Sequence, residues 1–155
     1  ATHPYGSPFY SWPFMLKPVY YWVDNNSETP SRIYLLGNPV IWYSALIGLI
    51  GSLTIRKLTD QEKFQRNILL IGYLANFLPF WEVSRVLFLY HYFSAFIFSI
   101  GLLWFWLAHL KISNKVILGF FVLIIISFIF FAPLTYGFPL SPAQYNLRVW
   151  LKTWI

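Results

Sequence analysis

The chain has 155 residues, of which 58% are apolar and only 10% are charged, and its mean hydropathy is +0.58. A soluble domain of this size usually carries about 25% charged residues, so this composition excludes an ordinary soluble domain and indicates a protein embedded in the bilayer. The net charge of +6 comes from basic residues that occur singly or in pairs beside apolar runs. This pattern is typical of the loops that orient a membrane protein, and it argues against a nucleic-acid partner.

Cysteine is absent, which excludes disulfides, thiolate catalysis and Cys-type metal sites. The three His and five acidic residues show no metal-ligand spacing, so we expect no metal site. The chain begins without the basic and apolar regions of a signal peptide, and we expect it to be a piece of a longer protein.

Four apolar runs predict four transmembrane helices, at residues 39–55, 64–81, 86–110 and 116–132. The second run has a clean apolar part of only 15 residues, which spans about 22 Å at ~1.5 Å per residue. A hydrocarbon core is about 30 Å thick, so we expect this helix to extend into the preceding turn or to lie half-buried against its neighbours. The fourth run is expected to end at Pro133.

The distribution of Lys and Arg predicts the orientation of these helices. Four basic residues lie in the loop 56–66 and two in the loop 111–115, so we place both loops in the cytoplasm. The remaining connections then share the extracytoplasmic face, where we expect the functional site. The predicted regions are an interfacial segment at 1–38, a four-helix membrane region at 39–132 and an extracytoplasmic tail at 133–155.

The two flanking segments are expected to lie at the membrane surface. The first contains too many prolines for one long helix and too many aromatics for a free loop, and Lys17 is expected to face lipid phosphates. Its Asn-Asn-Ser at 25–27 fits a glycosylation sequon, a weak signal. In the tail, Leu147, Trp150, Leu151 and Trp154 follow the spacing of an amphipathic helix. The sequence therefore predicts an all-α integral membrane fold with four transmembrane helices, an interfacial N-terminal segment and a C-terminal amphipathic helix.

Arg85 stands at the predicted start of the third helix, where two apolar runs meet across a short turn. An ionisable residue in this position either anchors the helix end at the interface or serves a functional site. The functional alternative is an anion site, because a guanidinium directs two donors towards a phosphate at a border of low dielectric constant. Glu82, three residues earlier, is expected to form an ion pair with Arg85 rather than to act as a general base.

Further polar residues follow on the third predicted helix. At about 100° per residue, Tyr92 and Ser99 fall within about 40° of Arg85 and predict a polar stripe that descends from it. His91 lies about 120° from that stripe. Two interpretations of His91 remain open, namely a hydrogen-bonded packing residue and a catalyst. His109 borders the cytoplasmic turn and is expected to be interfacial.

Four segments resemble the C-terminal four-span region of the protein O-mannosyltransferases: HPYGSPFYSWPFMLKPVYYW, LLGNPVIW, GYLANFLPFWEVSRVLFLYHYFSAFIF and FAPLTYGFPLS. The resemblance covers nearly the entire chain, in the order and spacing of the family. The YLxNxLPF…R…FLYHY and SWP…P patterns are its specific part, whereas GNP or APLTYG alone are not specific.

This resemblance implies the C-terminal part of a membrane glycosyltransferase of the GT-C type. Such enzymes transfer mannose from a polyprenyl- or dolichyl-phosphate carrier to Ser or Thr of exported proteins, with inversion at the sugar. The donor is the lipid-linked sugar, and no further cofactor is implied. The resemblance also implies a bacterial plasma membrane or the endoplasmic reticulum membrane, with the functional face extracytoplasmic or lumenal.

In this family the carrier phosphate is the leaving group, so cations near the membrane surface would stabilise its developing charge. The resemblance places two basic residues and several polar residues of this chain at matching positions. The predicted residues for binding the lipid phosphate and substrate are Arg85, Lys17, His91, Tyr92, His3 and Ser7.

The chain departs from the family at the catalytic acid. That acid belongs to an adjacent Asp-Glu pair in the first extracytoplasmic loop, and no adjacent pair exists among the five acidic residues here, which are Asp24, Glu28, Asp60, Glu62 and Glu82. We therefore expect no catalytic residue in this chain. The base that deprotonates the acceptor hydroxyl is expected in a missing N-terminal half of the enzyme.

Two other functions are compatible with these residues. One is a non-catalytic membrane subunit that holds a lipid carrier or a partner protein. The other is a related GT-C transferase that uses another sugar or a lipid acceptor. A transporter is disfavoured, because no predicted span carries the intramembrane charges or interrupted helices of transporters.

Overall fold

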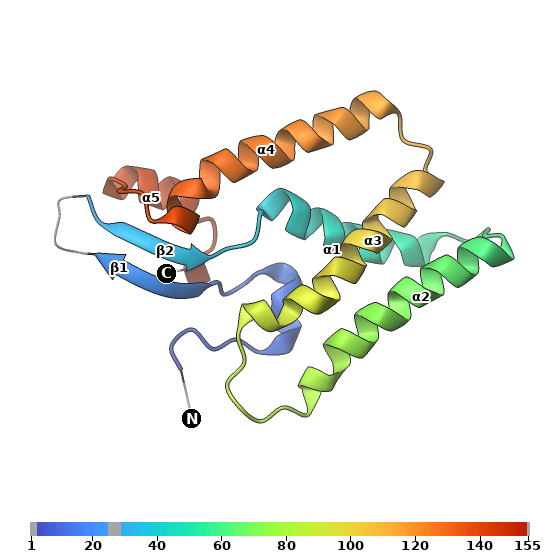
Figure 1. Cartoon of the computed structure of the whole chain (residues 1–155), viewed down its shortest axis with the longest axis horizontal. Coiled ribbons are helices and arrows are strands. Elements are labelled where there is room, and N and C mark those ends of the chain that lie inside the picture. Colours follow the sequence, from blue (N-terminus) through green and yellow to red (C-terminus); the bar gives the residue numbers. More distant parts are fainter. Residues whose placement is uncertain (1–2, 25–28, 155) are drawn as a thin grey trace.

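The computed structural model describes residues 3–24 and 29–154, so the sequon at 25–27 lies outside the described residues. Four long helices occupy most of the described chain (Figure 1). They are α1 (Pro39–Thr54), α2 (Asp60–Phe77), α3 (Phe93–His109) and α4 (Asn114–Tyr136). The shorter elements are η1 (Phe9–Phe14), β1 (Val19–Asp24), β2 (Ser31–Leu35), η2 (Leu78–Trp81), η3 (Leu89–Tyr92), α5 (Pro142–Arg148) and η4 (Lys152–Trp154).

Helix α3 lies between α1 and α2 and packs against both, whereas α4 packs mainly on β2 and touches α1 (Figure 1). Within residues 3–24 and 29–154, two segments are long and apolar enough to cross a membrane, namely Leu89–His109 and Asn114–Tyr136. Helix α1 is also apolar but has 16 residues, about 24 Å at ~1.5 Å per residue. The mostly helical fold is confirmed, and the count of four spans stays a prediction at this point.

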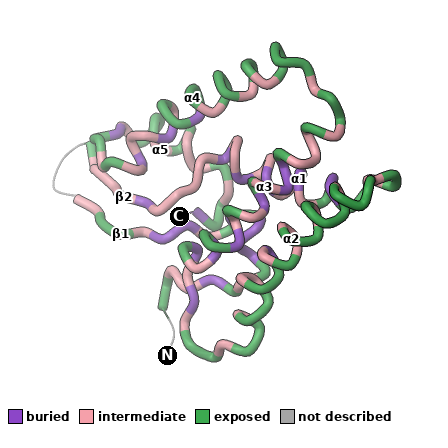
Figure 2. Tube along the Cα trace, turned by 45° about the vertical axis from the view of Figure 1, so that its right-hand side comes forward, coloured by how far each residue is buried: buried purple, intermediate pink, exposed green. Residues whose placement is uncertain are grey.

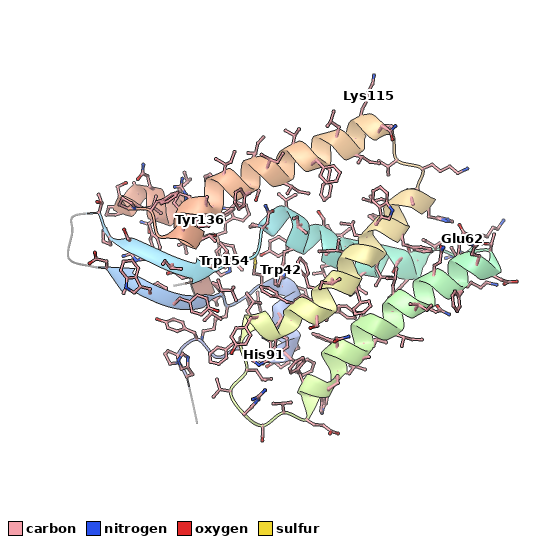
Figure 3. The ribbon with its side chains drawn as sticks, in the orientation of Figure 1. Trp42, Glu62, His91, Lys115, Tyr136 and Trp154 are labelled. Carbon is pink, nitrogen blue, oxygen red and sulfur yellow. The ribbon has the colours of Figure 1, made fainter. Side chains whose placement is uncertain are left out.

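The turns before α2 and α4, which we expect in the cytoplasm, lie at the same end of the helices. Figure 3 shows Glu62 and Lys115 at this end, and His91 and Tyr136 towards the other. His109 Nδ1 lies 3.6 Å from Glu62 Oε1, which joins the end of α3 to the start of α2. Hydrogen bonds from the backbone N–H and side chain of Thr59 lower the pKa of Glu62, so its carboxylate is charged at neutral pH.

The third helix was predicted from residue 86, and this start is wrong. Residues 82–88 are not helical, a 3-10 turn follows at Leu89–Tyr92, and α3 begins at Phe93. The N-terminal segment explains the difference, because Ser7 N donates to Leu87 O at 2.8 Å and satisfies a carbonyl that a helix would otherwise have used. Arg85 is therefore not on a helical stripe with Tyr92 and Ser99.

The prediction of an all-α fold is wrong for part of the N-terminal segment. β1 and β2 form an antiparallel hairpin that pairs Val19 with Leu35 and Asp24 with Ser31, with an irregularity between Tyr20 and Trp22. The sequence carries a signal for it, since VYYWVD and SRIYL are β-branched and aromatic runs separated by turn-forming residues. Aromatic residues of this kind are common both in strands and at membrane interfaces, so their composition alone does not distinguish the two.

The fourth helix does not end at Pro133 but continues to Tyr136, where Gly137 adopts a left-handed conformation with φ +70°. Proline removes a backbone donor and crowds the carbonyls of the preceding turn. The carbonyl that loses its helical donor is that of Ile129, four residues before Pro133, and Arg148 Nε donates to the adjacent Phe130 O at 2.7 Å. In a membrane a proline inside a helix is tolerated where neighbouring groups bind the backbone around it, and Arg148 binds that turn of α4.

The tail is not one amphipathic helix. α5 ends at Arg148, Val149 is extended, and a separate 3-10 turn follows. Leu147 and Trp150 are exposed, but Trp154 is only 2% exposed, because its Nε1 donates to Met15 O at 2.8 Å. Recruitment of Trp154 into the core breaks the stripe that the spacing predicted.

The tail is also fastened to the hairpin by a pair of tyrosines. The hydroxyl oxygens of Tyr34 and Tyr145 are 2.6 Å apart, and the Arg32 guanidinium lies 4.2 Å from the centre of the Tyr145 ring. Burial, followed by the hydrogen bond to Tyr145, raises the pKa of Tyr34 well above its ordinary value. Tyr34 is therefore protonated at neutral pH and contributes a neutral hydrogen bond.

The buried core lies where the N-terminal segment, the hairpin, η3 and the tail meet the ends of the long helices, as Figure 2 shows. Most of α4, in contrast, is exposed (Figure 2). The largest fully buried side chains include Trp12, Trp42 and Tyr92. The best-packed part of the chain is thus the predicted extracytoplasmic end.

Close packing of α1 on α3 gives a test of the fold. A Cβ at Gly48 would lie 2.3 Å from the Leu103 Cα, and backbone atoms cannot rotate away as a side chain can. We expect Gly48→Ala to lower the free energy of unfolding by about 1–3 kcal/mol. Gly119→Ala is the matched control, because a Cβ there meets nothing within 4 Å. Equal unfolding midpoints for the two purified variants in detergent would contradict the contact between α1 and α3.

Candidate functional site

A surface pocket of about 380 Å³ lies between the N-terminal segment and the non-helical connection that precedes η3. It brings together three of the six predicted site residues, which are His3, Ser7 and Arg85. Aromatic and aliphatic side chains form the rest of its lining. The other lining residues are Gly6, Pro8, Phe9, Phe80, Trp81, Val83, Val86 and Leu87.

The two walls of this pocket are joined through the backbone at one point. Ser7 N donates to Leu87 O at 2.8 Å, and Gly6 N donates to His3 O at 3.0 Å. Gly6 permits this close approach, since a Cβ there would lie 2.9 Å from Val86 Cγ1 and 3.2 Å from His3 O. The N-terminal segment therefore lies directly against residues 86 and 87.

Arg85 contributes a cation that nothing in the described part of the chain neutralises. Its side chain is exposed, and among the described residues it has no ion pair and no hydrogen bond. The predicted pair with Glu82 is wrong, because Glu82 lines a different groove with residues of α2 and η2. Of the acidic residues in the part of the chain that the structure describes, none lines the pocket of Arg85. Such a site favours an anion over a cation.

His3 is exposed at the rim, with its ring edge-on to Phe88 at 5.1 Å. Its Nδ1 accepts a hydrogen bond from Tyr5 N at 3.2 Å. A ring nitrogen that accepts carries no proton, so the proton of the neutral ring is on Nε2. His3 therefore has an N–H donor beside the pocket that meets no acceptor among the residues the structure describes.

His91 and Tyr92 do not line the pocket. The His91 ring stacks on Tyr90 at 4.5 Å and lies nearly parallel to Trp12 at 6.0 Å, and its Nδ1 is 3.2 Å from Phe88 N. Tyr92 is 2% exposed, with its hydroxyl 3.3 Å from that of Tyr73. The structure places both residues in the packing behind the pocket.

Lys17 lies between η1 and β1, half-buried, and does not line the pocket. The tail runs beside it, because the Thr153 hydroxyl donates to Leu16 O. Lys17 follows η1, Arg85 precedes η3, and η1 contacts η3, so the two residues lie at the same end of the helices but not in the same cavity.

The residues that hold the N-terminal segment in place were not evident from the sequence. Trp12 is fully buried, its Nε1 donates to Ser7 Oγ at 2.9 Å, and its carbonyl accepts from Trp42 Nε1 at 2.9 Å. The only sequence signal for Trp12 was its place in the SWP pattern. Aromatic composition alone assigned such residues to the membrane interface.

A second cavity of about 380 Å³ lies between α1, α3 and α4. It is lined almost wholly by apolar side chains and carries no charged group, so it offers hydrocarbon contact but no chemistry. Among the residues that the structure describes, no three His, Asp or Glu side chains gather as a metal site. The pocket of Arg85 is therefore the better candidate for binding a charged ligand.

Comparison with known proteins decides the family. The family model for the C-terminal four transmembrane region of protein O-mannosyltransferases matches residues 1–154. This chain belongs to the protein O-mannosyltransferase family. The resemblance found in the sequence is thereby confirmed. The family description names four transmembrane segments, whereas length and hydropathy identify two candidate spans among the described residues, so four spans in this chain stay a prediction.

Relatives occur in animals, fungi and bacteria. Protein O-mannosyltransferase 1 of Drosophila pseudoobscura pseudoobscura is 31% identical over 99% of this chain and 20% of that protein. Dolichyl-phosphate-mannose--protein mannosyltransferase 5 of Candida albicans is 32% identical over 98% of this chain and 25% of that protein. Polyprenol-phosphate-mannose--protein mannosyltransferase of Mycolicibacterium smegmatis is 25% identical over 98% of this chain and 33% of that protein.

A solved structure has the same fold. The S. cerevisiae protein O-mannosyltransferase Pmt1-Pmt2 complex bound to the sugar donor contains a chain that matches all of this chain, with a TM-score of 0.80 and 26% identity. The match covers 24% of that chain. This member of the family thus spans about a fifth to a third of the length of the relatives described here.

The close approach at Gly6 predicts how the pocket responds to a larger side chain. Gly6→Val should push the N-terminal segment away from Val86 and open the wall at Ser7, which is 5% exposed. With a single cysteine introduced as Ser7→Cys, we expect the rate of modification by a soluble maleimide to rise severalfold when Gly6→Val is added. The matched reporter Glu82→Cys, outside the pocket, should react at an unchanged rate. Equal rates at position 7 with and without Gly6→Val would contradict this contact.

Proposed function

We propose that this chain is the C-terminal membrane part of an enzyme that transfers mannose from a polyprenyl- or dolichyl-phosphate carrier to Ser or Thr of exported proteins. We also propose that the pocket lined by Arg85, His3 and Ser7 binds the phosphate of the carrier. The names of the relatives support the reaction. The observation that supports the binding role is a guanidinium that has no ionic partner among the described residues, in a pocket that no described acidic residue lines.

The chemistry of the donor explains why such a pocket helps. When the bond between mannose C1 and the phosphate oxygen breaks, the electron pair stays on the oxygen and the phosphate gains negative charge. A guanidinium that directs two N–H donors at these oxygens binds the products of cleavage better than the intact donor. Arg85 is thereby proposed to lower the barrier, and the N–H of His3 to add a second donor.

The acceptor hydroxyl needs a base, and no carboxylate among the described residues lines the pocket. Asp60 and Glu62 start α2 at the opposite end of the helices, and Glu82 lines the neighbouring groove. The base is therefore proposed to come from the remainder of the polypeptide, as the resemblance implies. This chain's part in the reaction is to hold the leaving group.

The proposed reaction also fixes the partners and the location. The donor is a membrane lipid and the acceptor an exported protein, so both meet at the extracytoplasmic or lumenal surface of a bacterial plasma membrane or endoplasmic reticulum membrane. The predicted orientation puts the pocket of Arg85 on that surface. Lys17, at the same end, is proposed to contact lipid phosphates beside the carrier.

Substitution of Arg85 in the full-length enzyme tests the binding role. We expect Arg85→Ala to lower kcat/KM for dolichyl-phosphate mannose by about 10- to 100-fold, the effect of losing hydrogen bonds from a charged donor. The kcat/KM of Arg85→Lys should lie between those of the wild type and of Arg85→Ala, since lysine keeps the positive charge but cannot direct two N–H donors at one phosphate. Arg56→Ala is the matched control, because Arg56 is equally exposed but lies at the opposite end. Equal kcat/KM for Arg85→Ala and Arg56→Ala would refute the phosphate role.

A further inference from the structure

Trp12 touches the candidate pocket only from behind. It is fully buried in η1, and its indole lies between the Ser7 hydroxyl and the rings of Phe80 and His91. Its carbonyl accepts a hydrogen bond from Trp42 Nε1 of α1. The orientation of the indole is thus set by several parts of the fold at once.

The hydrogen bond between Trp12 and Ser7 has only one possible direction. An indole N–H donates and cannot accept, so Ser7 Oγ must be the acceptor in the contact of 2.9 Å. A serine hydroxyl has one proton and two lone pairs, and this contact occupies a lone pair. The proton of Ser7 is therefore left for another acceptor.

That proton has no acceptor among the described residues. The backbone N–H of Ser7 is already used by Leu87 O, and no described oxygen or nitrogen accepts from Oγ. Ser7 is 5% exposed and lines the pocket of Arg85. A buried hydroxyl without an acceptor is unfavourable by about 1–3 kcal/mol, so the site gains when a ligand supplies one.

We propose that Trp12 is a positioning residue that holds Ser7 as a hydrogen-bond donor, so that Ser7 and Arg85 together bind the oxygens of an anionic phosphate. This role rests on the proposed function of the pocket. An ionised phosphate oxygen accepts hydrogen bonds and does not donate them. It therefore matches the Ser7 hydroxyl, which the Trp12 N–H restricts to the role of donor towards the pocket. The same arrangement disfavours a ligand group that can only donate.

A double-mutant cycle separates this role from simple packing. We expect Trp12→Phe and Ser7→Ala each to weaken binding of dolichyl phosphate to the full-length protein in nanodiscs by roughly three- to tenfold, the effect of one hydrogen bond. The double variant should bind no more weakly than Ser7→Ala alone, because Trp12 acts through Ser7. Effects of the two changes that multiply, or unchanged binding in Trp12→Phe, would overturn the proposal.

Trp154→Phe is the matched control. It also removes a buried indole N–H that donates to the N-terminal segment, at Met15 O, but it does not touch Ser7. We expect it to lower the unfolding midpoint about as much as Trp12→Phe and to leave binding unchanged. If Trp12→Phe does not fold, 3-benzothienylalanine replaces Trp12, because it keeps the size of the ring and lacks the N–H. The binding results expected for Trp12→Phe, and those that would overturn the proposal, then apply to this variant.

The assay also distinguishes this proposal from the proposed function. Unchanged binding in Arg85→Ala means that the pocket does not hold the carrier phosphate, and both proposals fail. Weakened binding in Arg85→Ala together with multiplying effects of Trp12→Phe and Ser7→Ala removes only the role of Trp12.

Discussion

Three buried indole N–H groups hold this structure together at the end that carries the candidate pocket. An indole that leaves water must find an acceptor, and an unsatisfied one costs about 1–3 kcal/mol. Trp12, Trp42 and Trp154 all find theirs within residues 7–15, at Ser7 Oγ, Trp12 O and Met15 O. The N-terminal segment is thereby fastened to α1 and to the tail, although it contains little regular structure of its own.

The candidate pocket is a consequence of this fastening. The segment is held against residues 86 and 87, where Ser7 N donates to Leu87 O. Because that carbonyl is already used, α3 does not extend back to residue 86 and begins at Phe93. Arg85 is left on an exposed connection, away from Glu82 and without a partner among the described residues. The long helices contribute the scaffold, and the irregular segments between them contribute the charge and the donors.

The sequence predicted the features that depend on local composition. It failed where the end of one element is set by hydrogen bonds from a segment distant in the sequence. Hydropathy located all four long helices, because an apolar run is a local property. It misplaced the start of α3, the end of α4 and the shape of the tail. The start of α3 and the shape of the tail depend on Ser7 and Trp154, which form hydrogen bonds with positions distant in the sequence, and α4 ends only at the left-handed Gly137. The hairpin was readable in principle, since its strands carry β-branched and aromatic runs.

The residues of the candidate site were also predicted only in part from the sequence. Helical spacing linked Arg85 to Tyr92 and Ser99, and this link was wrong because residue 85 is not in the helix. Resemblance to the family, rather than spacing, brought His3 and Ser7 into consideration beside Arg85, and these three line one pocket. Nothing in the sequence identified Trp12 as the residue behind that pocket, since buried and interfacial tryptophans have the same composition signal.

The most direct test is a cryo-EM reconstruction of the full-length protein in nanodiscs with dolichyl-phosphate mannose bound. We expect density for the phosphate within about 3 Å of the Arg85 guanidinium, the reach of a direct hydrogen bond, in the pocket that His3 and Ser7 also line. A carrier phosphate bound elsewhere, with Arg85 facing only water or lipid, would contradict the assignment of this pocket.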